Sequence, residues 1–118
     1  MENGYRDLKV WQKAIDLSVM VYKTTQRFPR EERFGLTSQL RRAAVSVPAN
    51  IAEGHGRTTA GEYRQGLSVG RGSLKEVETL CEIAYRLEYL DEEAYRTLLS
   101  LCTEISKMLT VLKRSIRR

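Results

Sequence analysis

The sequence predicts an all-α protein, folded as an antiparallel up-down-up-down four-helix bundle in a single domain over residues 1–118. Apolar residues recur at spacings of three and four in four separate segments, as they do on one face of a helix. The chain has only two prolines, so long stretches lack the strongest helix breaker. Short links between the segments favour antiparallel neighbours. The expected helices cover about residues 7–28, 37–55, 59–90 and 92–116.

The first helix is predicted from apolar residues that repeat at helical spacing: Leu8, Trp11, Ile15, Val19 and Tyr22. We expect this face to turn toward the core. Asp7 stands in front of it, where its carboxylate can cap the first turn. Ser18 is small enough to lie at a contact between helices. Pro29 and the charged residues after it mark the connection to the next helix.

The second helix is predicted from a similar apolar pattern: Leu36, Leu40, Ala43, Ala44, Val47 and Ile51. Thr37 or Ser38 is the expected N-cap. Pro48 falls inside the pattern, where it removes one backbone hydrogen bond and should bend the helix. Gly54 and Gly56 mark the end of the helix, as glycines commonly do.

The third helix opens with Thr59 and Glu62, which have the spacing of a capping box. Its apolar residues repeat in heptads: Tyr63, Leu67, Gly70, Leu74, Val77, Cys81 and Ala84. Gly66, Gly70 and Gly72 each cost about 1 kcal/mol against alanine inside a helix. We expect close packing against a neighbouring helix to compensate for them.

The fourth helix is predicted to begin after Asp91, its expected N-cap, with Glu92 and Glu93 in the first turn. Its core face is predicted to consist of Leu98, Leu101, Cys102, Ile105, Leu109, Leu112 and Ile116. The last residues of the helix are basic, which also suits the negative end of a helix dipole.

The residue types needed for catalysis or metal binding are scarce. His55 is the only histidine, so neither a di-iron carboxylate site nor a histidine-dependent nucleophile can be assembled. Cys81 and Cys102 lie within apolar patterns and are expected to be buried thiols. We therefore expect no enzyme activity, no cofactor and no metal. The chain shows no signal peptide and no apolar run of membrane-spanning length, which predicts a cytoplasmic location with no membrane partner.

The connection after the second helix leaves two alternatives open. Residues 54–59 could form an anion site at the start of the third helix, but the simpler interpretation is a turn in which His55 is solvated. Asn50 and Glu53 lie one helical turn apart, and a structural role, such as a hydrogen bond between them or to an arginine, is the better hypothesis.

Basic residues give the clearest indication of a partner. Lys and Arg number 20 against 15 Asp and Glu, for a formal net charge of +5. This excess suits nucleic acid, an anionic membrane surface or an acidic protein, although it could serve solubility alone. The basic residues are segregated from the acidic ones, which favours nucleic acid bound through phosphates with low sequence specificity. The predicted phosphate contacts are Arg41, Arg42, Arg57, Arg64, Arg71, Lys75, Lys113 and Arg114.

The alternative is a protein-protein scaffold that docks a partner on one face of the bundle. Exposed aromatic side chains would support it, and the candidates are Tyr5, Tyr85, Tyr89 and Tyr95. Under either hypothesis, faces rich in small residues and glycine favour self-association.

Four segments of the chain, residues 7–14, 28–44, 45–54 and 72–78, resemble the bacterial four-helix bundle family linked to intervening sequences of 23S ribosomal RNA genes. The most specific blocks are Gln39-Leu40-Arg41-Arg42-Ala43 and Asn50-Ile51-Ala52-Glu53-Gly54. The resemblance implies a four-helix bundle assembled as a homopentameric ring, without an established enzyme activity. The chain is also similar to the accessory protein of diversity-generating retroelements, a basic pentamer that binds nucleic acid and works with a reverse transcriptase. Glu88 departs from the family, because relatives often carry glycine there as a helix C-cap.

Overall fold

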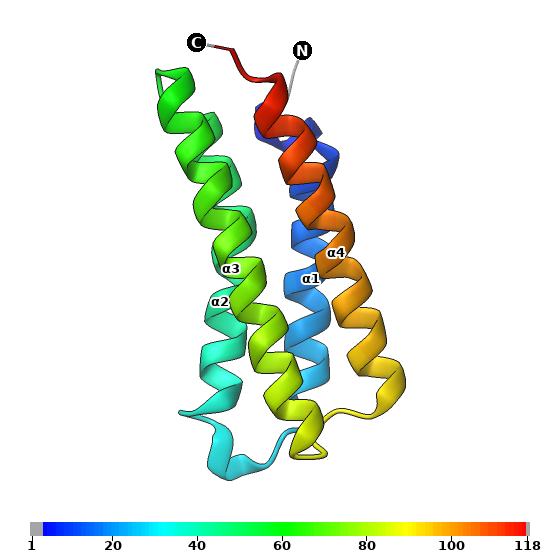
Figure 1. Ribbon diagram of the computed structural model, residues 1–118. Coiled ribbons are helices and arrows are strands. Elements are labelled where there is room, and N and C mark those ends of the chain that lie inside the picture. The colour runs from blue at the N-terminus through cyan, green and yellow to red at the C-terminus, as the bar shows by residue number, and fades with distance from the viewer. Residues whose placement is uncertain (1–3, 118) are drawn as a thin grey trace.

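The computed structural model describes residues 4–117, and these contain four long helices and no strand. The helices are α1 (Lys9–Thr25), α2 (Leu36–His55), α3 (Ala60–Arg86) and α4 (Glu92–Ser115), with short 3-10 turns η1 (Gly4–Asp7) and η2 (Arg30–Glu32). Figure 1 shows the long helices side by side, with successive helices joined at alternating ends of the molecule. Each helix packs against two neighbours, so that α1–α2 and α3–α4 form opposite sides of the bundle. The all-α class is confirmed.

One hydrophobic core runs between the four helices. The core faces predicted for α2 and α3 are buried almost throughout, although Tyr63 is only partly covered. Of the predicted face of α4, Leu98, Cys102, Ile105 and Leu109 are buried, whereas Leu101, Leu112 and Ile116 are only partly buried. These helices carry one dominant apolar stripe, so its position in the sequence predicts the buried side.

The predicted core face of α1 is wrong. Val19 and Tyr22 are 48% and 44% exposed, and Leu8, Trp11 and Ile15 are only partly buried. The face that enters the core consists of Val10, Ala14, Leu17, Ser18 and Val21. Both apolar stripes of α1 have helical spacing. The stripe with the smaller side chains is the buried one, because it lets α2 pack closely against α1. A second apolar stripe is thereby left near the surface.

Ser18, on α1, forms a hydrogen bond to α2 at a carbonyl group that Pro48 leaves without its usual amide donor. Pro48 has no amide hydrogen, so it cannot donate to the Ala44 carbonyl one turn earlier. The hydroxyl of Ser18 lies 3.1 Å from that carbonyl oxygen and 3.1 Å from the carbonyl oxygen of Ala14. The buried carbonyl of Ala44 therefore keeps a hydrogen-bond partner, and α2 continues past Pro48 as one helix.

Glycines allow the closest helix contact in the molecule, between α2 and α3. A Cβ atom placed on Gly66 would lie 2.7 Å from the carbonyl oxygen of Asn50 and 2.9 Å from the Cα of Gly54. A Cβ on Gly54 would in turn lie 3.0 Å from the carbonyl oxygen of Tyr63. The expected compensation for glycine in α3 is thus found at Gly66, whereas Gly72 faces open space.

Of the four predicted N-caps, those of α3 and α4 are confirmed and those of α1 and α2 are wrong. Thr59 accepts the amide hydrogen of Glu62 at 3.1 Å, and Asp91 accepts that of Ala94 at 2.8 Å, as predicted. Asp7 belongs to η1 and Leu8 is the N-cap of α1. Thr37 and Ser38 lie inside α2.

The start of α2 is capped by a side chain that precedes the helix. The carboxylate of Glu32, in η2, accepts the amide hydrogen of Leu36 at 3.0 Å through Oε1. Its other oxygen accepts the hydroxyl of Tyr89 at 3.1 Å. Because the η2 turn brings Glu32 back over the helix, its carboxylate replaces the serine or threonine cap that the sequence suggested.

Glu88 adopts the left-handed conformation that glycine usually supplies at a helix C-terminus. Its φ is +67°, the only positive φ of a non-glycine residue among those described. The amide of Tyr89 donates to the carbonyl of Ala84 at 2.9 Å, and that of Glu88 to the carbonyl of Tyr85 at 2.9 Å. This is the Schellman pattern, so the glycine-type cap persists without glycine and α3 ends at Arg86.

Gly66→Ala and Gly72→Ala should have opposite effects on stability. Gly66→Ala places a methyl group against the backbone of α2 and should lower the free energy of unfolding by about 1–3 kcal/mol. Gly72→Ala removes a poor helix former from an open site and should raise it by about 1 kcal/mol. Urea denaturation followed by circular dichroism measures both. Equal effects of the same sign would contradict the close contact.

Glu88→Gly should raise the free energy of unfolding by about 1 kcal/mol, because glycine relieves the left-handed strain. Glu88→Ala is the control, since alanine removes the carboxylate but keeps the strain. The expected result in thermal denaturation is a higher midpoint for Glu88→Gly alone. A gain of similar size from Glu88→Ala would assign the effect to charge.

Candidate nucleic-acid interface

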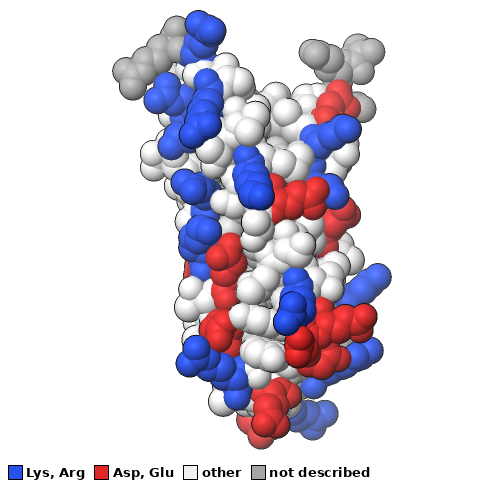
Figure 2. All heavy atoms as spheres, turned by 45° about the vertical axis from the view of Figure 1, so that its right-hand side comes forward, with Lys and Arg blue, Asp and Glu red and all other residues white. Residues whose placement is uncertain are grey.

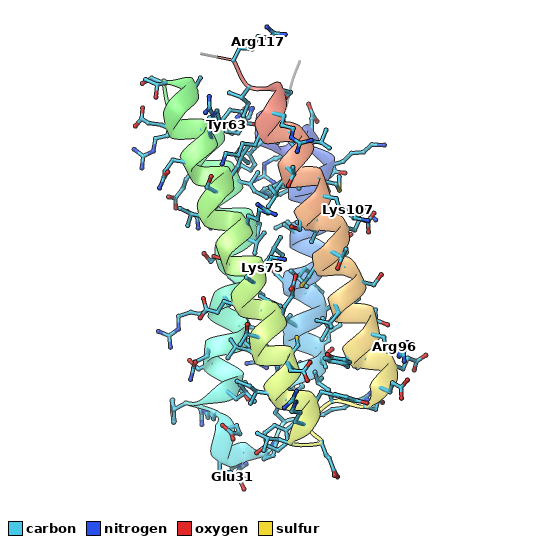
Figure 3. The ribbon with its side chains drawn as sticks, in the orientation of Figure 1. Glu31, Tyr63, Lys75, Arg96, Lys107 and Arg117 are labelled. Atoms are coloured by element: carbon cyan, nitrogen blue, oxygen red, sulfur yellow. The ribbon has the colours of Figure 1, made fainter. Side chains whose placement is uncertain are left out.

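A groove between α3 and α4 brings together five of the eight basic residues predicted to contact phosphates. Its volume is about 740 Å³, and the basic residues that line it are Arg64, Arg71, Lys75, Lys113 and Arg114. The first three share one side of α3 because they are spaced by seven and four residues. The other two come from the last turn of α4. Figure 3 shows Lys75 at mid-height between the two helices.

Hydroxyl groups on opposite walls hold two of these side chains across the groove. The ammonium group of Lys113, on α4, donates to the hydroxyl of Ser68, on α3, at 2.7 Å. Arg71, on α3, reaches Ser106, on α4, with Nε at 3.4 Å from the hydroxyl oxygen. The cationic groups therefore lie within the groove, and their remaining N–H donors are available to a ligand.

Carboxylates neutralise little of this charge. Lys75 pairs with Glu78 at 3.5 Å, but Arg64, Arg71, Lys113 and Arg114 form no ion pair within the described part of the chain. Figure 2 shows Lys and Arg gathered along the upper left of the face that carries α4, whereas acidic and basic groups mix lower down. Like charges held together raise the energy of the free protein, and a bound anion would relieve that repulsion.

The other three predicted residues lie elsewhere. Arg41 and Arg42 are on the opposite side of the bundle, where they line a groove beside α1 and the start of α2. Arg57 follows α2 and lines a small pocket with the carboxylates of Glu53 and Glu62. The fold thus divides the predicted set. The five members on α3 and α4 line one groove, and the other three lie outside it.

The groove also holds hydroxyl groups that were not predicted from the sequence. They belong to Ser68, Ser106 and Thr110; Ser68 follows Arg64 by one helical turn, and Thr110 precedes Lys113 by about one. A hydroxyl one turn from a basic residue on the same face is a detectable signal in the sequence. Which hydroxyl meets which cation depends on the register between α3 and α4.

The tyrosines predicted to be exposed are partly buried against other side chains. Tyr85 and Tyr95 stack with their ring centroids 4.2 Å apart. The Tyr95 hydroxyl donates to Glu82, and this bond raises the pKa of Tyr95 and lowers that of the Glu82 carboxyl. Tyr89 packs on Phe28, and its hydrogen bond to Glu32 raises its pKa.

Tyr5 lies 5.2 Å from Trp11, measured between ring centroids. The aromatic residues classed as exposed are instead Tyr22 and Phe34.

Asn50 and His55 have structural contacts that differ from those expected. Asn50 does not bond Glu53; its amide donates to the carbonyl and hydroxyl of Ser46 at 2.8 and 2.9 Å. Ser46 in turn lies 2.8 Å from the hydroxyl of Ser73 on α3, so this chain of hydrogen bonds links the two helices. His55 is the last residue of α2 and packs edge-on against Tyr63, so it is not a solvated turn residue.

Groups suited to chemistry are inaccessible or isolated. Cys81 and Cys102 are buried as expected, and burial raises the pKa of each thiol to about 12. Such thiols are poor nucleophiles near neutral pH because the thiolate is the reactive form. Residues 4–117 contain no cluster of three metal-ligating side chains. None of the four long helices combines the length and hydropathy needed to cross a membrane.

The fold and the groove define a small all-α bundle protein with a cationic groove between two helices. The chain belongs to the 23S rRNA-intervening sequence protein family, whose sequence profile matches residues 6–111. It is similar to a crystal structure of a protein with unknown function from the S23 ribosomal protein family of Bacteroides thetaiotaomicron. That likeness has a TM-score of 0.80 at 25% identity and covers 90% of this chain and 99% of the other. No curated protein matches the chain.

Removing unpaired cations from the groove should stabilise the free protein at low ionic strength. The double variant Arg64→Gln/Arg114→Gln should raise the thermal midpoint by about 2–4 °C, because it relieves repulsion worth about 1 kcal/mol. The gain should vanish near ~1 M NaCl, where the screening length falls to about 3 Å. Lys75→Gln is the control, since that ammonium group is already paired. A gain that persists in high salt would point to packing instead.

Proposed function

We propose that the chain is a non-enzymatic, oligomeric module that binds nucleic acid, RNA or an RNA–DNA intermediate, mainly through its phosphates. The observation that carries this proposal is the α3–α4 groove, where four cations without carboxylate partners lie together. Anionic ligands in general would suit it. Nucleic acid is favoured because the cations form an extended row rather than a single cluster.

The row matches a repeating polyanion. Arg64 and Lys75 are eleven residues apart on α3, which corresponds to about 16 Å at 1.5 Å per residue. Lys113 and Arg114 line the facing wall. A chain of phosphates laid along the groove would meet several cations in turn and release counterions from each, which makes binding steeply dependent on salt.

No aromatic side chain among the described residues lines the groove. Besides its basic residues and hydroxyls, its walls carry the aliphatic side chains Leu67, Leu109 and Ile116 and the bare backbone of Gly72. Proteins that hold single-stranded bases usually stack them on aromatic side chains. Contacts in this groove would therefore be made to the backbone, with low sequence specificity.

The proposal includes no catalytic step and no cofactor. His55 is held against Tyr63 at the end of α2, and the two cysteines are buried and protonated near neutral pH. We propose that the chain binds its nucleic-acid partner in the cytoplasm.

The proposed assembly is a homopentameric ring of up-down-up-down bundles, as the family resemblance implies. Apolar side chains that remain exposed on α3 and α4, among them Val69, Ile83 and Val111, are available for contacts between subunits. Burial of such residues would stabilise the ring. The alternative is a scaffold that docks a protein such as a reverse transcriptase. The exposure of Val19 and Tyr22 on α1, 48% and 44%, favours it.

The triple variant Arg64→Ala/Arg71→Ala/Lys113→Ala should weaken binding of a labelled RNA in fluorescence anisotropy. Each lost phosphate contact should reduce the slope of log K against log salt by about 0.7–0.9. The control Lys9→Ala/Arg86→Ala/Arg96→Ala removes the same net charge outside the groove and should leave the slope nearly unchanged. An equal reduction in both variants would indicate general charge attraction. No binding by the wild-type chain at low salt would refute the proposal.

A further inference from the structure

A second groove, on the side of the bundle opposite the α3–α4 groove, combines exposed aromatic side chains with arginines. Its volume is about 380 Å³, and it lies beside α1, the start of α2 and the turn between them. The residues that define it here are Tyr22, Arg33, Phe34, Arg41, Arg42 and Val45. The proposed phosphate contacts in the other groove make no use of it.

Phe34 is the most exposed large hydrophobic side chain among the described residues, with 86% of its surface accessible. Phe34 lies just before α2, and its ring neither belongs to the hydrophobic core nor packs against it. The Arg33 guanidinium lies over the ring, with Cζ 5.2 Å from the centroid. An exposed aromatic ring with a cation on one face is a common platform for a second flat ligand.

Tyr22 is the second exposed ring, and its position is fixed by an arginine. The guanidinium of Arg41 lies over the Tyr22 ring with Cζ 4.6 Å from the centroid. The same guanidinium donates to the Thr25 hydroxyl at 2.8 Å and approaches the Tyr22 carbonyl oxygen at 3.4 Å. Arg41 is therefore held in place, while its remaining N–H donors are directed at no described residue.

The charged residues around these rings indicate what kind of ligand the groove would bind. Arg33, Arg41 and Arg42 form no ion pair with a described carboxylate, and no acidic residue lines the groove. Two copies of this face would repel one another, and so would this face and the basic α3–α4 side. An occupant that is both flat and anionic satisfies the rings and the guanidinium groups together. A nucleotide has these two properties.

We propose that Phe34 and Tyr22, with Arg33, Arg41 and Arg42, form a stacking site for an unpaired nucleobase of single-stranded nucleic acid. The base lies on the open face of Phe34, and the adjoining phosphate takes the free donors of Arg41 and Arg42. Paired bases cannot reach the ring, so the site distinguishes single strands from duplexes. This inference rests on the proposed function, to which it adds a preference that the phosphate-binding groove alone would not produce.

The test compares Phe34→Ala with the wild-type chain in anisotropy titrations of labelled oligoadenylate and of an RNA duplex of equal length. Loss of one stacked base should weaken oligoadenylate binding by about 5-fold to about 150-fold. Duplex binding should stay within about twofold, and the salt slope should not change, because no phosphate contact is removed. Leu87→Ala is the matched control, since it shortens an exposed apolar side chain at the end of α3, outside both grooves.

Phe34→Trp provides a direct reading of stacking. It should keep oligoadenylate binding, and the fluorescence of the indole introduced there should be quenched as oligoadenylate is added, beyond the change that Trp11 alone shows in the wild-type chain. An equal loss by Phe34→Ala on duplex and single strand, or no loss on either, overturns the stacking site. A change of particle mass in light scattering that accompanies the loss assigns the face to self-association and also overturns it.

The two proposals fail in different ways. If the wild-type chain binds neither probe at low salt, both are wrong. If Arg64→Ala/Arg71→Ala/Lys113→Ala loses binding while Phe34→Ala does not, the α3–α4 groove remains and the stacking site alone is discarded.

Discussion

The contact between the backbones of α2 and α3 is the constraint on which the rest of the structure depends. At Gly66 the two helices approach so closely that there is no room for a Cβ atom, and at Gly54 a Cβ would be only 3.0 Å from the facing backbone. The hydrogen bonds from Asn50 through Ser46 to Ser73 extend this contact toward the middle of α3. A fixed α3 then determines which of its faces meets α4, and that face carries the cationic groove.

The α3–α4 groove keeps like charges close together. Four cations without carboxylate partners lie together between α3 and α4, although the chain carries acidic residues that could neutralise them. The bundle tolerates their repulsion because Lys113 and Arg71 are anchored to serine hydroxyls and the core beneath them is well packed. An anionic ligand would relieve this repulsion, which is the physical basis of the proposed function.

The two basic surfaces on opposite sides of the bundle have different chemistry. The α3–α4 groove has hydroxyls and aliphatic walls, which suit a sugar-phosphate backbone. The groove beside α1 and α2 has exposed rings covered on one face by guanidinium groups, which suit a flat base. A nucleic acid that contacts both surfaces has to pass around the bundle or bridge two copies of it.

The sequence alone determined the helices, because apolar periodicity and the caps at Thr59 and Asp91 depend on residues close together in the chain. It also identified the shared side of Arg64, Arg71 and Lys75, since spacings of seven and four place residues on one face of any helix. The core face of α1 could not be chosen in this way. Two apolar stripes have the same period there, and only the close approach of α2 selects the one with Ala14 and Ser18.

Contacts between distant parts of the chain decided the rest. The Ser18 hydroxyl meets the Ala44 carbonyl, and the Tyr89 hydroxyl meets the carboxylate of Glu32, because the fold brings them together. The division of the eight basic residues among three surfaces has the same cause: a sequence gives the face of each helix but not which faces meet. The exposure of Phe34 is likewise a tertiary result, since a ring beside a helix is buried or open according to what packs over it.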